Sequence, residues 1–126
     1  MKFIYSDKIP TPKGHYSPAV VHNDIVYVSG QLPVAPDKES HEIGTIEEQF
    51  DQVIKNLKNV LEAAGSNLSH ILRVTIYVSD IELWGRINAV YSDHFGEHRP
   101  ARTIVPTRDL HYGYHVELDA IAAVIK

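Results

Sequence analysis

The stretch "TIEEQFDQVIKNLKNVLEAAG", residues 45–65, constrains the fold of this chain more than any other. Its apolar residues recur every three or four positions, the spacing that places them on one face of an α-helix. Thr45 and Glu48 match a capping box at the start, and Gly65 fits the left-handed residue after a helix end. The apolar positions are Ile46, Phe50, Val53, Ile54, Leu57, Val60, Leu61 and Ala64. The segment therefore predicts an amphipathic helix that buries one face.

A second amphipathic helix is predicted from about Asp80 to Phe95. Ser79 with Glu82 offers a further capping box, and Gly96 followed by Pro100 would end the helix. Its apolar stripe consists of Leu83, Trp84, Ile87, Val90 and Tyr91.

The other apolar stretches favour β-strands, because they are short and rich in β-branched residues. A tight turn at residues 22–25 is expected to join the first two, and Pro106 places the fourth at a sheet edge or a strand end. The five stretches are residues 17–21, 24–30, 71–79, 102–107 and 115–125.

This order of elements predicts one α+β domain over residues 1–126, with two helices on one face of a mixed sheet. The opposite sheet face would then lack a cover within the chain. An uncovered apolar face commonly packs against another subunit.

Composition narrows the possible functions. The formal net charge is −4, which argues against broad nucleic-acid binding, and the absence of cysteine excludes disulfides and thiolate catalysis. No apolar run reaches the roughly 18 to 20 residues that span a bilayer, and the N-terminus lacks the apolar stretch of a secretory signal. We therefore expect no membrane association and a cytoplasmic location.

Eight histidines raise the question of a metal site. "HFGEH", residues 94–98, matches the H-x-x-E-H pattern of some zinc enzymes, which needs a continuous helix. Gly96 lies inside the motif, so the helix is expected to end there. "HYGYH", residues 111–115, contains Gly113 and precedes a strand, which favours a loop. The sequence therefore predicts no metal site.

Two groups of residues suit acid–base chemistry on a small anion. Arg102 lies at the entry to a predicted strand, where its guanidinium could bind a carboxylate. Glu117 and Asp119 share one face of the last strand, so burial and like charge would raise at least one pKa. Arg99 and Arg108, close to Arg102, are expected to pair with acidic groups or to remain solvated. Ordinary surface pairing remains the alternative for every one of these groups.

Seven segments in order over nearly the whole chain resemble one known family, the RidA/YjgF imine deaminases, formerly called L-PSP endoribonucleases. The segments are "GHYSPAV", "YVSGQLP", "EEQ", "NLKNVLEAAG", "INAVYSDHF", "RPARTIV" and "HVELDAIA". The resemblance implies a chorismate-mutase-like fold with a six-stranded mixed sheet, assembled as a homotrimer with three clefts between subunits. It also implies a hydrolase acting on C=N bonds, of the 2-iminobutanoate/2-iminopropanoate deaminase type. Such enzymes convert reactive 2-imino acids, or enamines such as 2-aminoacrylate, to 2-oxo acids and ammonia without a cofactor.

The resemblance also implies roles for individual residues. Arg102 matches the arginine that binds the substrate carboxylate, helped by the backbone N–H of Ile104. Glu117 matches the glutamate that orients or activates water. Tyr16 and Ser29 match cleft-lining, substrate-binding positions, and Asn88 matches either a cleft-lining or a structural position.

The chain departs from the family pattern at several positions. His15 stands in place of proline and Ile104 in place of cysteine. The segment "LHYGYHVE" adds Tyr112, Tyr114 and the two histidines His111 and His115 near the presumed cleft. These changes either narrow the cleft or favour a larger imino acid. Alternative functions are a non-catalytic binder of small carboxylates, a deaminase of a larger enamine such as 2-aminomuconate, and an endoribonuclease or translation inhibitor.

Overall fold

The computed structural model describes residues 1–36 and 42–126 of the chain. Over these residues the strands are β1 (Lys2–Ile4), β2 (Ala19–His22), β3 (Ile25–Gln31), β4 (Ile71–Val78), β5 (Ala101–Pro106) and β6 (Val116–Ala123). The α-helices are α1 (Ile46–Ala63) and α2 (Trp84–Phe95), and short 3₁₀ turns occupy Leu68–His70, Ile81–Leu83 and His111–Gly113. The α+β class predicted from the sequence is confirmed.

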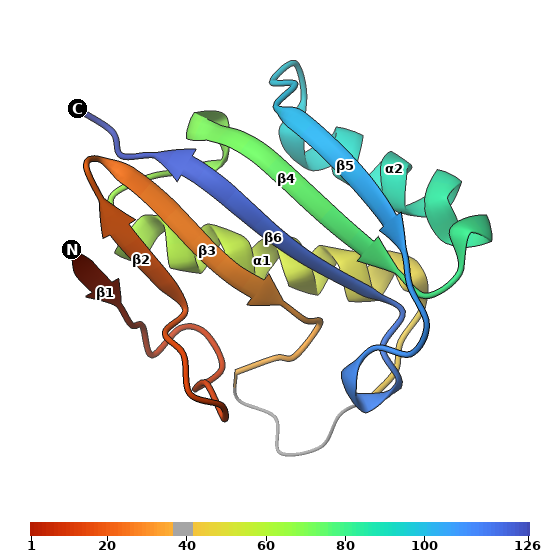
Figure 1. Ribbon diagram of the computed structural model, residues 1–126. Coiled ribbons are helices and arrows are strands. Elements are labelled where there is room, and N and C mark those ends of the chain that lie inside the picture. The colour runs from red at the N-terminus through yellow and green to blue at the C-terminus, as the bar shows by residue number, and fades with distance from the viewer. Residues whose placement is uncertain (37–41) are drawn as a thin grey trace.

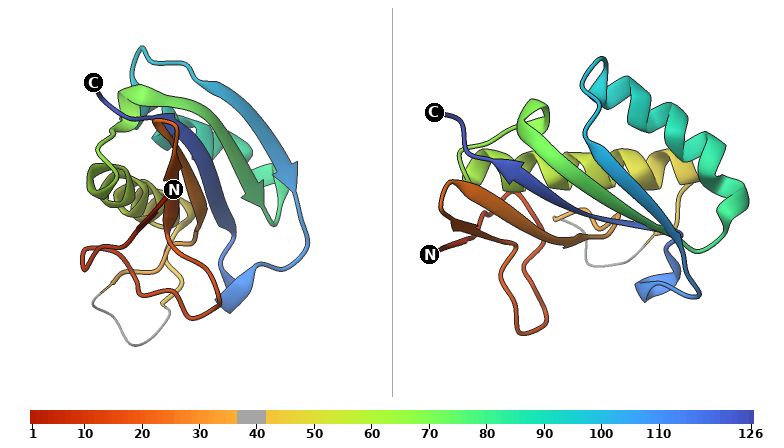
Figure 2. Two further views of the ribbon diagram at one scale, coloured as in Figure 1. Left: turned by 60° about the vertical axis from the view of Figure 1, so that its left-hand side comes forward. Right: turned by 45° about the horizontal axis from the view of Figure 1, so that its top comes forward.

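In this part of the chain the strands form one mixed sheet in the order β1-β2-β3-β6-β4-β5. β4 pairs with β5 in parallel, while its pairing with β6 is antiparallel. α1 and α2 both cover the same face of the sheet, and the opposite face carries no helix among the described residues (Figures 1 and 2). The prediction of two helices on one face of a six-stranded mixed sheet is therefore confirmed.

The core lies between α1 and the sheet because both present apolar residues to the same layer. Phe50, Ile54 and Leu57 of α1 are fully buried, as are Ile76 and Leu118, which face each other across β4 and β6. The capping box of Thr45 and Glu48 is present, and Gly65 has a φ of 79°. Local signals therefore fix both ends of α1, and burial of its apolar face holds it in place.

The strand predictions are confirmed with small shifts of their ends. The turn at 22–25 has Asn23 and Asp24 at positive φ, as expected for a tight hairpin, and Pro106 lies on the edge strand β5. β1 was not located from residue patterns, because three residues are too few to display a period.

The predicted cap of the second helix is wrong. The Asp80 side chain accepts the Glu82 N–H at 2.9 Å, and a 3₁₀ turn over Ile81–Leu83 precedes α2, which starts at Trp84 rather than near Asp80. Asp80, one residue after Ser79, satisfies the first free N–H group of this turn, so the Ser79–Glu82 box does not form. The predicted end of the helix at Gly96, with a φ of 60°, is confirmed.

Asn56 ties α1 to the chain that leaves β3. Its side chain is 1% exposed, and its amide nitrogen donates to the carbonyls of Leu32 at 3.1 Å and Val34 at 2.9 Å. Without this amide both carbonyls would lose a partner in a buried region, which is costly. Asn56 therefore fixes the course of the chain just after β3.

We expect Asn56→Ala to lower the free energy of unfolding by roughly 1 to 3 kcal/mol, because the Leu32 and Val34 carbonyls each lose a hydrogen bond. The Leu32 carbonyl still accepts the Val34 N–H at 2.8 Å. Urea unfolding at neutral pH measures the change. Asn59→Ala is the matched control, since Asn59 lies on the same helix and donates to the Lys8 carbonyl at an exposed site. A loss of stability in the control as large as that in Asn56→Ala would contradict the assignment.

Candidate active site

Arg102 is held against α2 by aromatic rings. Its guanidinium carbon lies 4.6 Å from the centre of the Trp84 ring and 4.8 Å from that of Tyr91. The Nη1 atom donates to Asn88 Oδ1 at 3.0 Å. Cation–π contacts and one hydrogen bond thus fix the direction of a charge that remains exposed to solvent. Asn88 acts here as a support for Arg102, and Arg99 and Arg108 are exposed elsewhere.

The free edge of β5 adds backbone donors beside Arg102. The Thr107 N–H donates to the Val78 carbonyl of β4 at 2.8 Å, so residues at odd positions of β5 direct their backbone groups toward β4. Backbone groups alternate in direction along a strand, so those of Ile104 point to the free edge. Pro106 has no N–H to offer there. We call Arg102, Asn88 and the Ile104 N–H the edge half-site.

Glu117 lies on the opposite, helix-free face of the sheet. It stands beside Tyr77 in the register, between the buried residues Val116 and Leu118. Burial raises the pKa of its carboxyl above the ordinary value; the charge of His111 opposes this shift and that of Asp119 adds to it. Asp119 shares the face, as predicted, and accepts a hydrogen bond from the Tyr77 hydroxyl at 2.9 Å. A carboxyl with a raised pKa is suited to accept and return a proton near neutral pH.

Gly30 makes room for this carboxylate. A Cβ atom built on Gly30 would overlap the Glu117 carboxylate, so any larger residue would displace it. The preceding residue, Ser29, donates its hydroxyl to the Ser17 carbonyl at 2.7 Å, and its N–H donates to the Pro18 carbonyl at 2.9 Å. Ser29 therefore fastens the segment that carries Tyr16 to the end of β3.

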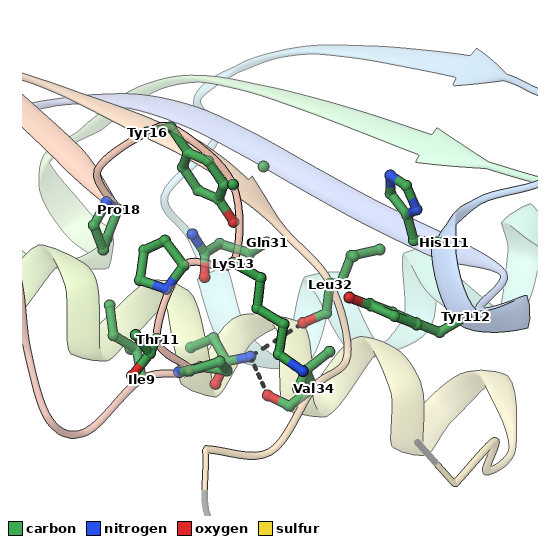
Figure 3. A pocket seen from close by; sticks show the side chains of 15 residues that line it. Ile9, Thr11, Lys13, Tyr16, Pro18, Gln31, Leu32, Val34, His111 and Tyr112 are labelled. Atoms are coloured by element: carbon green, nitrogen blue, oxygen red, sulfur yellow. Dashed lines mark hydrogen bonds between the residues drawn. The ribbon is translucent and has the colours of Figure 1, made fainter. Parts of the chain in front are cut away.

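A pocket of about 360 Å³ opens beside Glu117. Tyr16, Gly30, His111 and Tyr112 are among its lining residues, and the close view in Figure 3 has Tyr16 and Tyr112 reaching toward it from opposite sides. Tyr114, in contrast, is 3% exposed and lines a second hollow near Gln49. We call Tyr16, Ser29, Glu117 and Tyr112 the pocket half-site.

The two half-sites are far apart within one chain. Arg102 is level with Val74 of β4 and on the helix face, whereas Glu117 is level with Tyr77 and on the other face. Arg102 and Glu117 are thus three residues apart along the strands and two strands apart across the sheet, about 10 Å in each direction. A small molecule therefore cannot touch both groups of the same chain.

The histidines of both candidate metal motifs have other contacts. His94 Nε2 lies 2.8 Å from Asp51 Oδ1, and His98 Nε2 lies 2.8 Å from the Ile71 carbonyl oxygen. His115 Nδ1 lies 2.7 Å from Ser79 Oγ. Within residues 1–36 and 42–126 no group of three or more histidines and acidic residues is arranged to hold a metal ion. Over the same residues no helix has the length and apolar character needed to cross a membrane.

Sequence reasoning missed several site residues. Trp84 and Tyr91 were assigned only to the apolar stripe of the second helix, although they also enclose the Arg102 guanidinium. Gly30, which stands against the Glu117 carboxylate, gave no local signal, and His111 was expected near the cleft but not assigned to Glu117. Only pairing across strands, which a single sequence does not reveal, brings these residues together.

The fold and the half-sites define a small α+β protein with polar groups at two places on one sheet. The chain matches the family model described as Endoribonuclease L-PSP over residues 6–124. A RutC family protein of Pyrococcus abyssi is 39% identical over 119 residues, covering 94% of each chain. Among solved structures, the YjgF gene product of E. coli has a TM-score of 0.92 at 31% identity, covering 98% of each chain. E. coli TdcF with bound serine has a TM-score of 0.93 at 29% identity, covering 99% of this chain and 100% of TdcF. This chain therefore belongs to the RidA/YjgF family, also described as Endoribonuclease L-PSP.

The raised pKa of Glu117 predicts how stability varies with pH. The folded protein keeps this proton to a higher pH than the unfolded chain does. Glu117 therefore stabilises the fold fully only below its ordinary pKa of 4.5, and this contribution is lost as the pH rises through the raised pKa.

We expect Glu117→Gln to be more stable than the wild type at about pH 7, with the difference vanishing below about pH 4. Urea unfolding over this range measures it, with Glu97→Gln as a surface control for the lost charge. A constant difference at every pH would refute the assignment.

Proposed function

We propose that this protein is a 2-imino acid deaminase, a hydrolase that converts reactive imines or their enamine tautomers to 2-oxo acids and ammonia. The observation that carries the proposal is a half-buried glutamate of raised pKa, set against a glycine at the mouth of a pocket. Membership of the RidA/YjgF family agrees with this chemistry.

The reaction needs little beyond positioning and one proton shuttle. Water adds to the carbon of the protonated imine, whose C=N bond becomes a C–N single bond. Glu117 takes a proton from that water and returns it to the nitrogen, which makes the nitrogen a leaving group. As the C=O bond forms and the C–N bond breaks, Glu117 takes the remaining hydroxyl proton and passes it to the departing ammonia, which leaves as ammonium. The iminium carbon is already electrophilic, so a strong nucleophile is unnecessary and no cofactor takes part in these steps.

The edge half-site would bind the substrate carboxylate. The guanidinium of Arg102 is fixed in direction, and the Ile104 N–H lies on the same strand edge, so the two can hold an anion between them. TdcF contains bound serine, and removal of water from serine gives 2-aminoacrylate, a substrate of the proposed type. That ligand supports recognition of the carboxylate of an amino or imino acid.

The Ser29 hydroxyl oxygen would accept a hydrogen bond from the substrate. Its hydroxyl hydrogen is engaged by the Ser17 carbonyl, which leaves oxygen lone pairs for an N–H of the iminium group. Tyr16, on the segment that Ser29 fastens, would close the opposite side of the bound molecule.

Because the half-sites of one chain lie apart, we assign each complete site to two neighbouring copies in a homotrimer. The helix-free face offers the contact surface. Phe3, Val20, Tyr27 and Ile121 form one row across four strands of this face, and Phe3 and Tyr27 are 60% and 48% exposed. Such an apolar row is typical of a surface that another subunit covers.

The shared site predicts complementation between two inactive variants. Arg102→Ala and Glu117→Gln should each abolish the release of ammonia above the uncatalysed rate from freshly generated 2-aminoacrylate. When the two are unfolded together and refolded as a 1:1 mixture, about a quarter of the sites regain both groups, and about a quarter of the activity should return.

The matched control is Arg102→Ala refolded with a variant that carries both substitutions, because every site then lacks the arginine and activity should stay absent. Native mass spectrometry verifies trimers and mixing. Mixed trimers without activity would overturn the assignment of the site to two copies. Full activity of Arg102→Ala alone would remove the arginine from the mechanism.

Trp84 is predicted to position Arg102. Trp84→Leu keeps an apolar side chain but removes the ring under the guanidinium, so KM for the imino acid should rise about three- to tenfold with little change in kcat. Trp84→Phe should restore most of the affinity, because a ring is present again. Steady-state kinetics with both variants measure this, and an unchanged KM in Trp84→Leu would contradict it.

A further inference from the structure

The pocket beside Glu117 is formed by three separate segments together with Asn56 of α1. They are the N-terminal segment 9–18, residues 30–34 at and after the end of β3, and the turn at His111–Tyr112 (Figure 3). Gly30 belongs to the pocket wall and also stands against the Glu117 carboxylate. A group attached to a reacting carbon beside Glu117 would therefore extend directly into this pocket.

The pocket wall is largely apolar. Ile9, Leu32 and Val34 supply aliphatic surface, and Tyr16 and Tyr112 supply aromatic rings. The Lys13 side chain extends along the pocket in Figure 3 and remains exposed. A wall of this kind favours an apolar or aromatic group, and binding sites for small molecules are commonly built in this way.

Buried polar contacts maintain the shape of this pocket. Asn56, itself part of the lining, fixes Leu32 and Val34 through their carbonyls. On the other side Gln49, 3% exposed, accepts the His115 N–H at 2.9 Å and so anchors the end of the turn to α1. The pocket is therefore a fixed part of the fold.

Tyr112 is held in a costly conformation. Its φ is 64°, in the left-handed region that a residue with a bulky side chain seldom adopts. The following Gly113 also has a positive φ of 79°, and the Tyr112 ring meets the ring of buried Tyr114 edge-on at 6.3 Å. Strain of this kind persists where the surroundings enforce it and often marks a functional position. Here it accompanies a ring that lies in the pocket wall.

The size of the pocket indicates which substrate fits. A volume of about 360 Å³ lies within the range of pockets that hold whole drug-sized ligands. The methyl group of a three-carbon imino acid would leave most of it filled with water. Building on the function proposed above, we propose that this pocket receives the substrate side chain and that the preferred substrates are 2-imino acids with long apolar or aromatic side chains.

The test compares imino acids that differ only in the side chain. An amino-acid oxidase generates them from alanine, leucine, methionine and phenylalanine at matched rates, and the release of ammonia or 2-oxo acid above the uncatalysed rate is measured. We expect kcat/KM for the leucine- and phenylalanine-derived compounds to exceed that for the alanine-derived one by at least about tenfold.

Filling the pocket should remove this preference. Val34→Trp places bulk in the pocket, and Thr11→Trp does so from an exposed position where folding is little affected. Both should lower kcat/KM for the phenylalanine-derived imine about tenfold or more and leave the alanine-derived one within about twofold. Ala35→Trp is the matched control, because Ala35 follows Val34 in the chain but lines the second hollow instead of this pocket.

The outcomes separate this proposal from the proposed function. Equal kcat/KM for the alanine- and phenylalanine-derived imines would overturn the substrate class while leaving deaminase activity intact. Absence of turnover with every imine would refute the deaminase, and the pocket is then judged by calorimetric titration with phenylpyruvate and pyruvate. Phenylpyruvate binding at least about tenfold tighter, and lost in Val34→Trp, would support the pocket assignment; equal binding would overturn it.

Discussion

The alternation of side chains along β6 is the constraint on which the rest of this structure depends. Val116, Leu118 and Ala120 point into the layer covered by α1, so Glu117 and Asp119 must point to the other face. A shift of one residue in register would bury both carboxylates and expose the core residues. The burial that stabilises the domain therefore also fixes the position of the Glu117 carboxylate.

The same rule, applied to β5, sends Arg102 to the opposite face. β5 lies at the edge of the sheet, and Trp84 and Tyr91 of α2 stack on Arg102 there. A guanidinium can replace an aliphatic side chain there because it stacks on aromatic rings while its polar edge stays hydrated. The arginine thus belongs to the packing between β5 and α2 and still offers its charge to solvent.

Local signals in the sequence predicted most of the fold. The period of α1, its capping box, the turn at Asn23 and Asp24 and the edge position of Pro106 all depend on neighbouring residues, and the structure confirms each. The start of α2 was misjudged because Asp80, not Ser79, caps the turn that precedes it. β1 was not located because its place depends on pairing with β2 rather than on any pattern of its own.

The candidate site was only partly predictable for the same reason. Arg102 and Glu117 were singled out from their place in the sequence and given roles by resemblance. Their separation on the two faces of the sheet, however, follows from the register of β4 with β5 and β6. The cross-strand contact shows Gly30 to be a neighbour of Glu117, and the path of the turn brings His111, expected only near the cleft, next to the same carboxylate. Sequence reasoning named the candidate residues Arg102 and Glu117 but not the surfaces around them.

This geometry has a consequence for regulation of the proposed activity. If each site needs Arg102 from one copy and Glu117 from the next, a separated chain has neither a complete carboxylate site nor a complete proton relay. Assembly and catalysis would then share one equilibrium. Conditions that weaken the contacts made by Phe3 and Tyr27 between copies would also separate Arg102 from Glu117 and remove the site. The uncovered sheet face would in this way link the stability of the oligomer to its chemistry.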